Sequence, residues 1–208
     1  MVAVNNLRYH YPDGKTFIFN DLVCAAGEKM LVLGVSGSGK TSLLHLIAGI
    51  LRPATGSIRI NNTEITALSA RTMDRFRGQN IGMIFQQHYF FHGMDVMENL
   101  VAAQKLSGSE SDRLHLDNLM HEFGIFKLKN SKPTALSQGE QQRFSIARAL
   151  ANKPLLVLAD EPTSSLDDRN CETFIDMIMK STSSNKTGWV IASHDNRLKE
   201  HFDHVYGL

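Results

Sequence analysis

The sequence predicts an α/β fold built on a mainly parallel sheet, with a small antiparallel β subdomain and an inserted helical subdomain. Short apolar runs alternate with helical patterns, as in parallel sheets covered by helices on both faces. The segment "GSIRINNTEI" from Gly56 instead alternates polar and apolar residues, which is typical of a half-exposed strand. Residues 100–150 contain no strand-like run. With 208 residues and 42% apolar content, the chain can bury one sizeable core.

The strands of the main sheet are predicted from continuous apolar runs too short for buried helices. These runs are Lys29–Gly34, Ile81–Gln86, Leu155–Asp160 and Gly188–His194. The antiparallel sheet is predicted from the alternation of Ser57–Asn61 together with the N-terminal segment. Asn61 and Asn62 supply the positive φ that a tight hairpin turn needs.

The helical part is expected to cover residues 88–150, inserted into a core made of residues 1–87 and 151–208, so that residues 1–208 form a single domain. Within it, the pattern of Asp112–Phe126 predicts a helix that packs through Leu114, Leu119 and Phe123. Another helix is expected from Lys40 to about Leu51.

Charge and cysteine content exclude several classes of protein. The 22 Lys and Arg residues balance 21 Asp and Glu residues, so no basic excess indicates a nucleic-acid partner, and none is expected. Cys24 and Cys171 lie far apart without CxxC spacing and are interpreted as reduced thiols of an intracellular protein. The longest apolar stretch, which starts at Leu43, is too short to span a bilayer, so a membrane role requires a partner.

A glycine-rich segment, "GVSGSGKTS", follows the first apolar run and fits the pattern GxxxxGK[ST]. Its glycines allow a sharp turn in which several backbone amides face phosphate oxygens. Lys40 then reaches the β- and γ-phosphates, and Thr41 offers a hydroxyl to magnesium. The motif predicts a P-loop NTPase with a RecA-like, mainly parallel sheet. The expected nucleotide-binding residues are Gly34, Val35, Ser36, Gly37, Ser38, Gly39, Lys40, Thr41 and Ser42.

Two adjacent carboxylates end the run "LLVLADE". Asp160 is predicted to hold magnesium, and Glu161 to act as general base for the water that attacks the γ-phosphate. Pro162 keeps Glu161 out of helical geometry. The alternative is that the pair merely begins a loop. A GTPase is disfavoured, because "NKTG" at Asn185 and "NKPL" at Asn152 both fail the NKxD pattern.

A capping box is predicted where "LSQGEQQRFSIARAL" begins, because Ser137 and Glu140 stand three residues apart. The free amides of such a helix start form an anion site. Taken alone, the motif is better explained by a helix start that faces water. A small-molecule kinase does not predict this motif just upstream of the metal-binding strand.

Together these motifs resemble the nucleotide-binding domains of ABC transporters over almost the whole chain. "GVSGSGKT" resembles the Walker A loop, "LLVLADE" the Walker B strand, "LSQGEQQR" the LSGGQ signature and "SSLD" the D-loop. Gln86 matches the Q-loop glutamine and His194 the switch histidine. "GEQQR" and "DEPT-x-x-LD" point to the branch of lipoprotein-release, macrolide-export and FtsE-like ATPases. Gln138 departs from the usual glycine and would cost energy if its position required positive φ.

The resemblance implies an ATP hydrolase that uses ATP and Mg²⁺ and works as a head-to-tail dimer. The implied catalytic residues are Glu161, His194, Gln86 and Lys40. The implied metal ligands are Thr41, Gln86 and Asp160. Ser137, Gly139 and Glu140 would serve the nucleotide held mainly by the other subunit. Tyr11 would stack on adenine, although packing within the protein is the alternative for this side chain.

The implied partners are a second copy or a paralogous ABC ATPase, and an integral membrane permease that docks near Gln86–Phe91. Tyr89, Phe90 and Phe91 are either core rings or part of that docking groove. The implied location is cytoplasmic, peripheral on the inner face of the cell membrane. Two alternatives stay open: a soluble or mechanotransmitting, cell-division-like ATPase without cargo transport, and a nucleotide-gated module that scarcely hydrolyses ATP.

Overall fold

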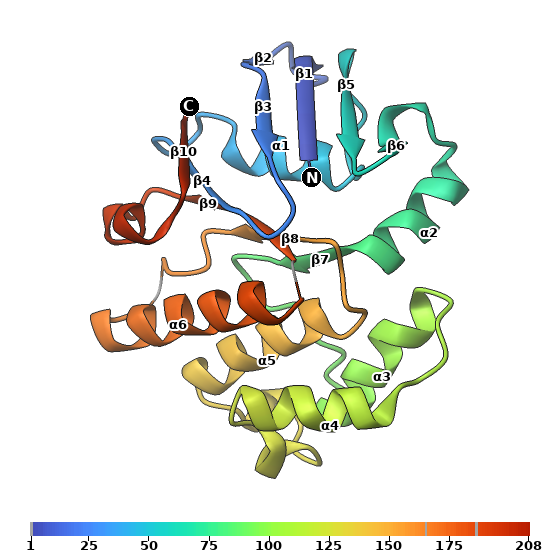
Figure 1. Cartoon of the computed structure of the whole chain (residues 1–208), viewed down its shortest axis with the longest axis vertical. Coiled ribbons are helices and arrows are strands. Elements are labelled where there is room, and N and C mark those ends of the chain that lie inside the picture. Colours follow the sequence, from blue (N-terminus) through green and yellow to red (C-terminus); the bar gives the residue numbers. More distant parts are fainter. Residues whose placement is uncertain (1, 165, 186) are drawn as a thin grey trace.

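Two five-stranded sheets organise the chain in a computed structural model that describes residues 2–164, 166–185 and 187–208 (Figure 1). The first sheet is wholly parallel, with the order β10-β4-β9-β8-β7. Its strands are β4 (Lys29–Leu33), β7 (Ile81–Ile84), β8 (Leu156–Asp160), β9 (Gly188–Ser193) and β10 (His204–Gly207). The four apolar runs are thereby confirmed as its strands, and β8 and β9 are buried along their whole length. Edge strand β10 is not among the predicted elements.

The second sheet is antiparallel and contains the predicted hairpin. Its strands are β1 (Val2–His10), β2 (Thr16–Phe19), β3 (Leu22–Cys24), β5 (Thr55–Ile60) and β6 (Thr63–Glu64). Asn61 has φ 49° in the β5–β6 turn, where Ile60 pairs with Thr63. The expectation of positive φ is wrong for Asn62, because this turn places only its first residue in the left-handed region. The predicted antiparallel subdomain is therefore confirmed.

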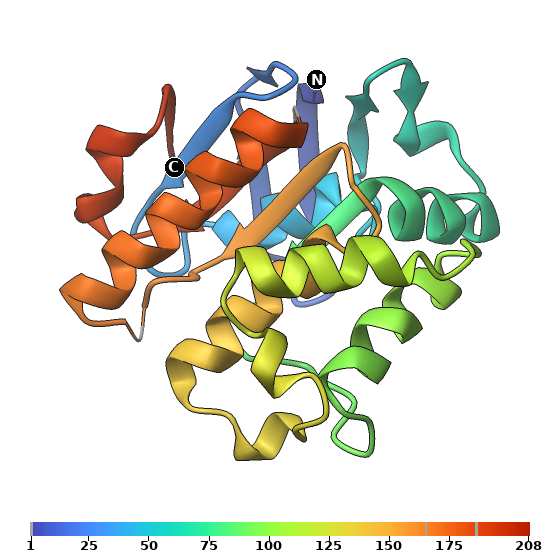
Figure 2. The same cartoon turned by 60° about the horizontal axis from the view of Figure 1, so that its bottom comes forward.

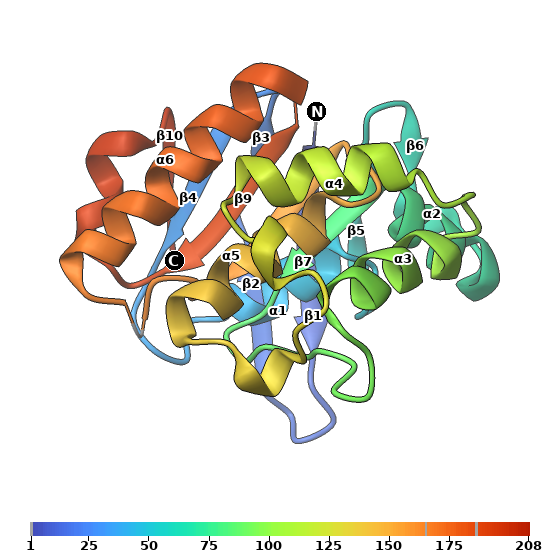
Figure 3. The ribbon, with the colours of Figure 1, turned by 90° about the horizontal axis from the view of Figure 1, so that it is seen from below.

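Helix α1 (Lys40–Ile47) lies between the two sheets, and its apolar side chains join both in one core. Helices α5 (Gln138–Leu150) and α6 (Asp168–Asn185) cover the other face of the parallel sheet (Figure 2). Phe144 and Phe174 of these helices are buried in the core that they share with its strands. Helices α3 (Val96–Leu106) and α4 (Arg113–Glu122) lie beyond α5 (Figure 3).

The remaining helices connect these layers. They are α2 (Ala70–Asn80) and the 3₁₀ helices η1 (Ile65–Ala67), η2 (Phe126–Leu128), η3 (Pro133–Ala135) and η4 (Asn196–His201). Residues 88–150, all of which are described, contain no strand. Because α5 packs on the parallel sheet, the division into a core and a helical subdomain stays a prediction.

Two expectations about helices are wrong in detail. Leu114 is 72% exposed, whereas Leu116 is fully buried together with Leu119 and Phe123. Asp112 caps the helix, and positions 116, 119 and 123 then share one face, while Leu114 lies on the opposite side. The helix from Lys40 ends at Ile47 rather than near Leu51, because the chain leaves the helical conformation at Gly49, with φ 63°.

Candidate functional site

The predicted phosphate loop connects β4 to α1 and requires glycine at a defined point. Gly39 has φ 106°, and a Cβ there would lie 2.6 Å from Cδ1 of Phe17. The loop wraps around the Lys40 side chain, whose Nζ donates to the carbonyls of Gly34 at 2.8 Å and Val35 at 3.2 Å. The loop is therefore folded around a buried ammonium group at the start of a helix.

One open pocket of about 680 Å³ brings together most of the predicted site residues. The predicted residues that line it are Tyr11, Val35, Ser36, Gly37, Gly39, Lys40, Thr41, Ser42, Gln86, Glu161 and His194. Asp13, Lys15 and Phe17 also line it and were missed from the sequence. Lys15 donates to the Gly37 carbonyl at 3.2 Å, and the only sequence signal for it is a basic residue shortly after Tyr11.

Glu161 is held at the mouth of the parallel sheet in a left-handed backbone conformation, with φ 46°. Its Oε1 lies 3.2 Å from Lys40 Nζ, and its Oε2 lies 2.9 Å from His194 Nδ1. Ser193, which the sequence analysis did not single out, donates to Oε2 at 3.2 Å. Burial acts to raise the pKa of Glu161, but the hydrogen bonds from His194 and Lys40 outweigh it and leave this pKa below its ordinary value.

Asp160 ends β8 and has the properties of a cation ligand. It is 8% exposed, and its buried Oδ1 has no hydrogen-bond partner among the described residues. Burial raises its pKa above the ordinary value, and the neighbouring Thr41 hydroxyl offsets this only in part. An unpaired buried carboxylate oxygen beside a hydroxyl fits a hard divalent cation such as Mg²⁺, which prefers oxygen ligands and retains several waters.

Tyr11 lies at the rim of the pocket and also packs within the protein. Its hydroxyl is hydrogen-bonded to Ser42 Oγ at 2.9 Å. Its ring meets Tyr9 edge-on at 4.7 Å and Phe17 at 6.0 Å between centroids. Tyr11 thus forms an aromatic cluster with Tyr9 and Phe17 beside the phosphate loop. Stacking of Tyr11 on adenine stays a prediction.

The predicted capping box is present at the start of α5. The Ser137 hydroxyl accepts from the Glu140 amide, and Glu140 Oε2 accepts from the Ser137 amide at 2.8 Å. Gln138 is absent from the residues with positive φ, so the glutamine adds no strain of the kind considered above. Ser137 is exposed, and neither it nor Gly139 nor Glu140 lines the pocket that holds Lys40.

The residues after Glu161 form hydrogen bonds with Glu161 itself, with α5 and with the start of α6. The Ser164 hydroxyl donates to the Glu161 carbonyl at 3.0 Å, and Gln142 of α5 donates to the Pro162 carbonyl at 3.1 Å. Asp167 accepts from the Asn170 amide at the start of α6. Ser165, within the "SSLD" motif, lies outside the described residues.

The aromatic residues after Gln86 divide into two groups. Phe90 stacks on Phe144 at 4.4 Å and is part of the core packing. Tyr89 and Phe91 are 62% and 47% exposed. Core packing is therefore confirmed for Phe90, whereas a docking role for Tyr89 and Phe91 stays a prediction.

Comparison with known proteins shows the family of this chain. The ABC transporter family profile matches residues 20–164. The lipoprotein-releasing system ATP-binding protein LolD of Pseudoalteromonas translucida is 34% identical over 206 residues, which span 96% of this chain and 89% of the relative. LolD of Xanthomonas campestris is 33% identical over 100% of this chain and 90% of its own.

Solved structures of ABC transporter proteins are also similar to this chain. The ATP-binding cassette MJ0796, in a dimeric post-hydrolysis state bound to ADP and Pi, superposes with a TM-score of 0.89 at 28% identity, over 100% of this chain and 94% of that chain. CbiO1 from Clostridium perfringens, part of the transporter complex CbiONQ, has a TM-score of 0.89 at 27% identity, over 99% of this chain and 83% of that chain. The chain belongs to the ABC transporter family and is one of its ATP-binding, ATP-hydrolysing subunits.

Proposed function

We propose that two such subunits close head to tail around two Mg-ATP molecules, so that each nucleotide is held by the phosphate loop of one subunit and by the Ser137 region of the other. The observation that carries this proposal is the separation of the two half-sites. Lys40, Glu161 and His194 converge on one pocket, whereas the exposed helix start at Ser137 lies outside it. A helix start with free amides suits a phosphate that arrives with a partner.

Within each site, Lys40 and the loop amides bind the phosphates, and Tyr11 stacks on adenine. Thr41, Asp160 and Gln86 hold Mg²⁺, which neutralises phosphate charge when it is bound. Glu161 takes the proton of the attacking water, and His194 orients that water and the γ-phosphate through the nitrogen that does not face Glu161.

Replacing the base tests this assignment. Glu161→Gln keeps the shape of the side chain but removes its basicity, so ATP hydrolysis should fall at least a hundredfold, in keeping with the usual contribution of a general base. The variant should also accumulate as an ATP-loaded dimer in light scattering. Glu172→Gln, an exposed position on α6, is the matched control and should retain activity. Rapid turnover by Glu161→Gln would refute the role of Glu161.

The second partner proposed is an integral membrane permease that inserts an amphipathic helix beside the Gln86–Phe91 segment. A groove of about 330 Å³ lies there, between α2, β7 and α3. Its rim carries exposed apolar side chains: Ile50, Phe91 and Leu106. Exposed apolar residues around a groove are typical of such recognition.

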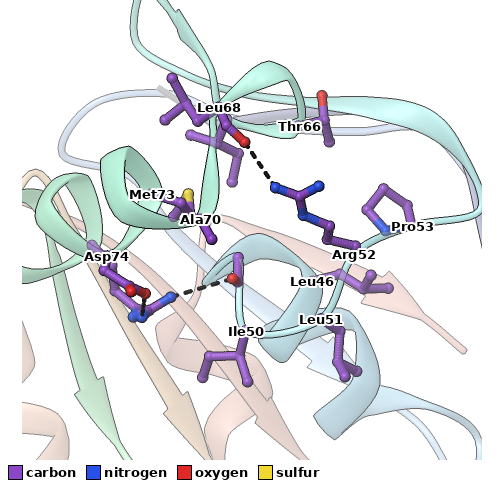
Figure 4. A pocket seen from close by; sticks show the side chains of 13 residues that line it. Leu46, Ile50, Leu51, Arg52, Pro53, Thr66, Leu68, Ala70, Met73 and Asp74 are labelled. Atoms are coloured by element: carbon purple, nitrogen blue, oxygen red, sulfur yellow. Dashed lines mark hydrogen bonds and ion pairs between the residues drawn. The ribbon is translucent and has the colours of Figure 1, made fainter.

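This groove adjoins a second, largely apolar pocket between the end of α1 and the start of α2 (Figure 4). Both are lined by Ile50, Asp74 and Arg77, and the Arg77 guanidinium donates to the Gly49 carbonyl at 3.2 Å. In the second pocket Arg52 donates to the Leu68 carbonyl at 3.0 Å. The shared residues make one continuous surface, which extends the area available to the permease.

A role in lipoprotein release at the cytoplasmic face of the membrane is supported by the LolD relatives. None of the described helices has the length and apolar character needed to cross a bilayer. Membrane pull-down in the presence of ATP and vanadate tests the partner, and Phe91→Asp should abolish the capture. A captured protein with no cargo-transport activity would instead favour the mechanotransmitting alternative.

A further inference from the structure

The segment that follows Gln86 is joined to α5 by a partly buried hydrogen bond that the proposed reaction does not use. His88 Nδ1 lies 2.8 Å from the hydroxyl of Ser145. Ser145 is 2% exposed, and the His88 ring stacks on Phe90 with 5.5 Å between ring centroids. A polar contact of this kind has a preferred direction, so it orients the segment as well as holding it.

Further contacts of the same segment also reach α5. Phe90 stacks on Phe144, and the Arg148 guanidinium lies 5.0 Å from the centroid of the Phe90 ring. Arg148 also donates to the Tyr89 carbonyl.

The position of this contact connects parts of two different nucleotide sites. His88 follows Gln86 by two residues, and Gln86 lines the pocket of its own subunit. Ser145 lies in α5, whose first turn is capped by Ser137 and, in the proposed dimer, faces the nucleotide of the other subunit. A continuous helix transmits a displacement along its axis with little internal adjustment, because successive turns are joined by i to i−4 backbone hydrogen bonds.

We propose that the His88–Ser145 hydrogen bond is a positioning contact. It couples Gln86 in one nucleotide site to α5, the helix that begins in the LSGGQ-like signature segment and serves the other nucleotide site. The inference rests on the proposed function. Movement of Gln86 toward a γ-phosphate is passed to α5 through His88, and α5 then presents Ser137 to the partner's nucleotide. ATP in one site thereby favours assembly of the second.

The test separates the hydrogen bond from the ring stack. His88→Phe keeps a ring against Phe90 and removes Nδ1, whereas His88→Asn places an amide where Nδ1 lies and removes the ring. Ser145→Ala removes the other partner and is the smallest change. Ser181→Ala is the matched control, since Ser181 is a 1%-exposed helical serine that donates to the carbonyl of Ile178 within its own helix. Each variant is purified, melted, and assayed for phosphate release across ATP concentrations.

We expect His88→Phe and Ser145→Ala to lower kcat about fivefold, the size expected for one hydrogen bond, and to lower the Hill coefficient for ATP toward 1. ATP binding to the monomer should stay unchanged, because neither residue lines the nucleotide pocket. His88→Asn should retain most of kcat and cooperativity. The double variant His88→Phe/Ser145→Ala should be no worse than either single variant, as for two partners of one contact.

The inference is overturned if His88→Phe and Ser145→Ala keep wild-type kcat and cooperativity, if His88→Asn is as impaired as His88→Phe, or if Ser181→Ala shows the same losses. Should His88→Phe melt below the assay temperature, Ser145→Ala decides the test. A wild-type chain without ATPase activity would overturn the proposed function and the coupling with it, which distinguishes that failure from a failure of the coupling alone.

Discussion

Asp195 directly follows His194 at the end of the buried strand β9. We expect substitution of its carboxylate to lower the free energy of unfolding by an amount that can be worked out from its contacts. Arg197 binds it with two nitrogens, Nε at 3.0 Å from Oδ1 and Nη2 at 2.7 Å from Oδ2. The Thr163 hydroxyl donates to Oδ2 at 2.9 Å. Arg197 continues to Asp168 at 2.5 Å, which joins the end of β9 to the start of α6. Asp195→Asn replaces one carboxylate oxygen, which accepts hydrogen bonds from Arg197 and Thr163, with an NH2 group that can only donate. The substitution also removes the negative charge that pairs with Arg197.

The magnitude follows from the pKa. Hydrogen bonds from Arg197, opposed by burial and aided by Thr163, lower the pKa of Asp195 from 3.8 to about 2. Since one pKa unit corresponds to about 1.4 kcal/mol, this is about 2 kcal/mol of stabilisation in favour of the folded state. Arg197 is 39% exposed, so screening by solvent reduces the expected loss to about 1–2 kcal/mol.

The assay is urea unfolding of wild type and Asp195→Asn, followed by the fluorescence of Trp189, which is fully buried and the single tryptophan of the chain. A lowered carboxyl pKa stabilises the protein above the unfolded value, near 3.8, and the effect is lost as pH falls toward 2. The difference between the two proteins should be constant from pH 7 to about 5 and shrink below about 4.

Asp203→Asn, which removes a 3.1 Å ion pair between Lys29 and a half-exposed carboxylate, is the control and should cost less than about 1 kcal/mol. A difference below about 0.5 kcal/mol for Asp195→Asn at pH 7, or one that grows as pH falls, would refute the reasoning.

Two further predictions concern helices. Leu116→Ala should lower the free energy of unfolding by about 2–4 kcal/mol, because Leu116 is fully buried. Leu114→Ala should change it by less than about 0.5 kcal/mol, because Leu114 is 72% exposed. Equal losses of the two variants in urea unfolding would contradict the assigned face of α4. Ser137→Ala should destabilise α5 by about 1 kcal/mol and lower ATP turnover without weakening ATP binding to the monomer; weaker binding by the monomer, measured by titration calorimetry, would contradict the placement of Ser137 outside its own subunit's site.

Local sequence predicted those parts of the fold whose cause is local. The apolar runs of β4 and β8 and the Asn61 turn each carry their signal within a few residues. Leu114 failed because helical periodicity alone does not say which face meets the core, and that face is set by α5 and α3, which come from elsewhere in the chain. Strand β10, with an exposed pattern and only four residues, becomes a strand through pairing with β4.

The same distinction applies to the site. Lys40 and Glu161 each lie in a contiguous sequence motif, so their grouping in one pocket could be predicted. Lys15 and Ser193 have no motif, and they reach the site only because the β1–β2 turn and the end of β9 fold against the phosphate loop. Long-range contacts of this kind leave no periodic or spaced signal in a single sequence.

The contacts of Glu161 predict that the proposed base is weak before nucleotide binds. Lys40 and His194 lower its pKa, and a carboxylate with a low pKa is a poor proton acceptor. Phosphate oxygens compete for the same Lys40 ammonium, which lies 3.2 Å from Oε1. Once Lys40 turns to the phosphates, Glu161 loses a cationic partner and its basicity rises beside the water it must activate. In the proposed mechanism ATP therefore strengthens the base that cleaves it, because the phosphates draw Lys40 away from the ion pair that it forms with Glu161 in the resting chain.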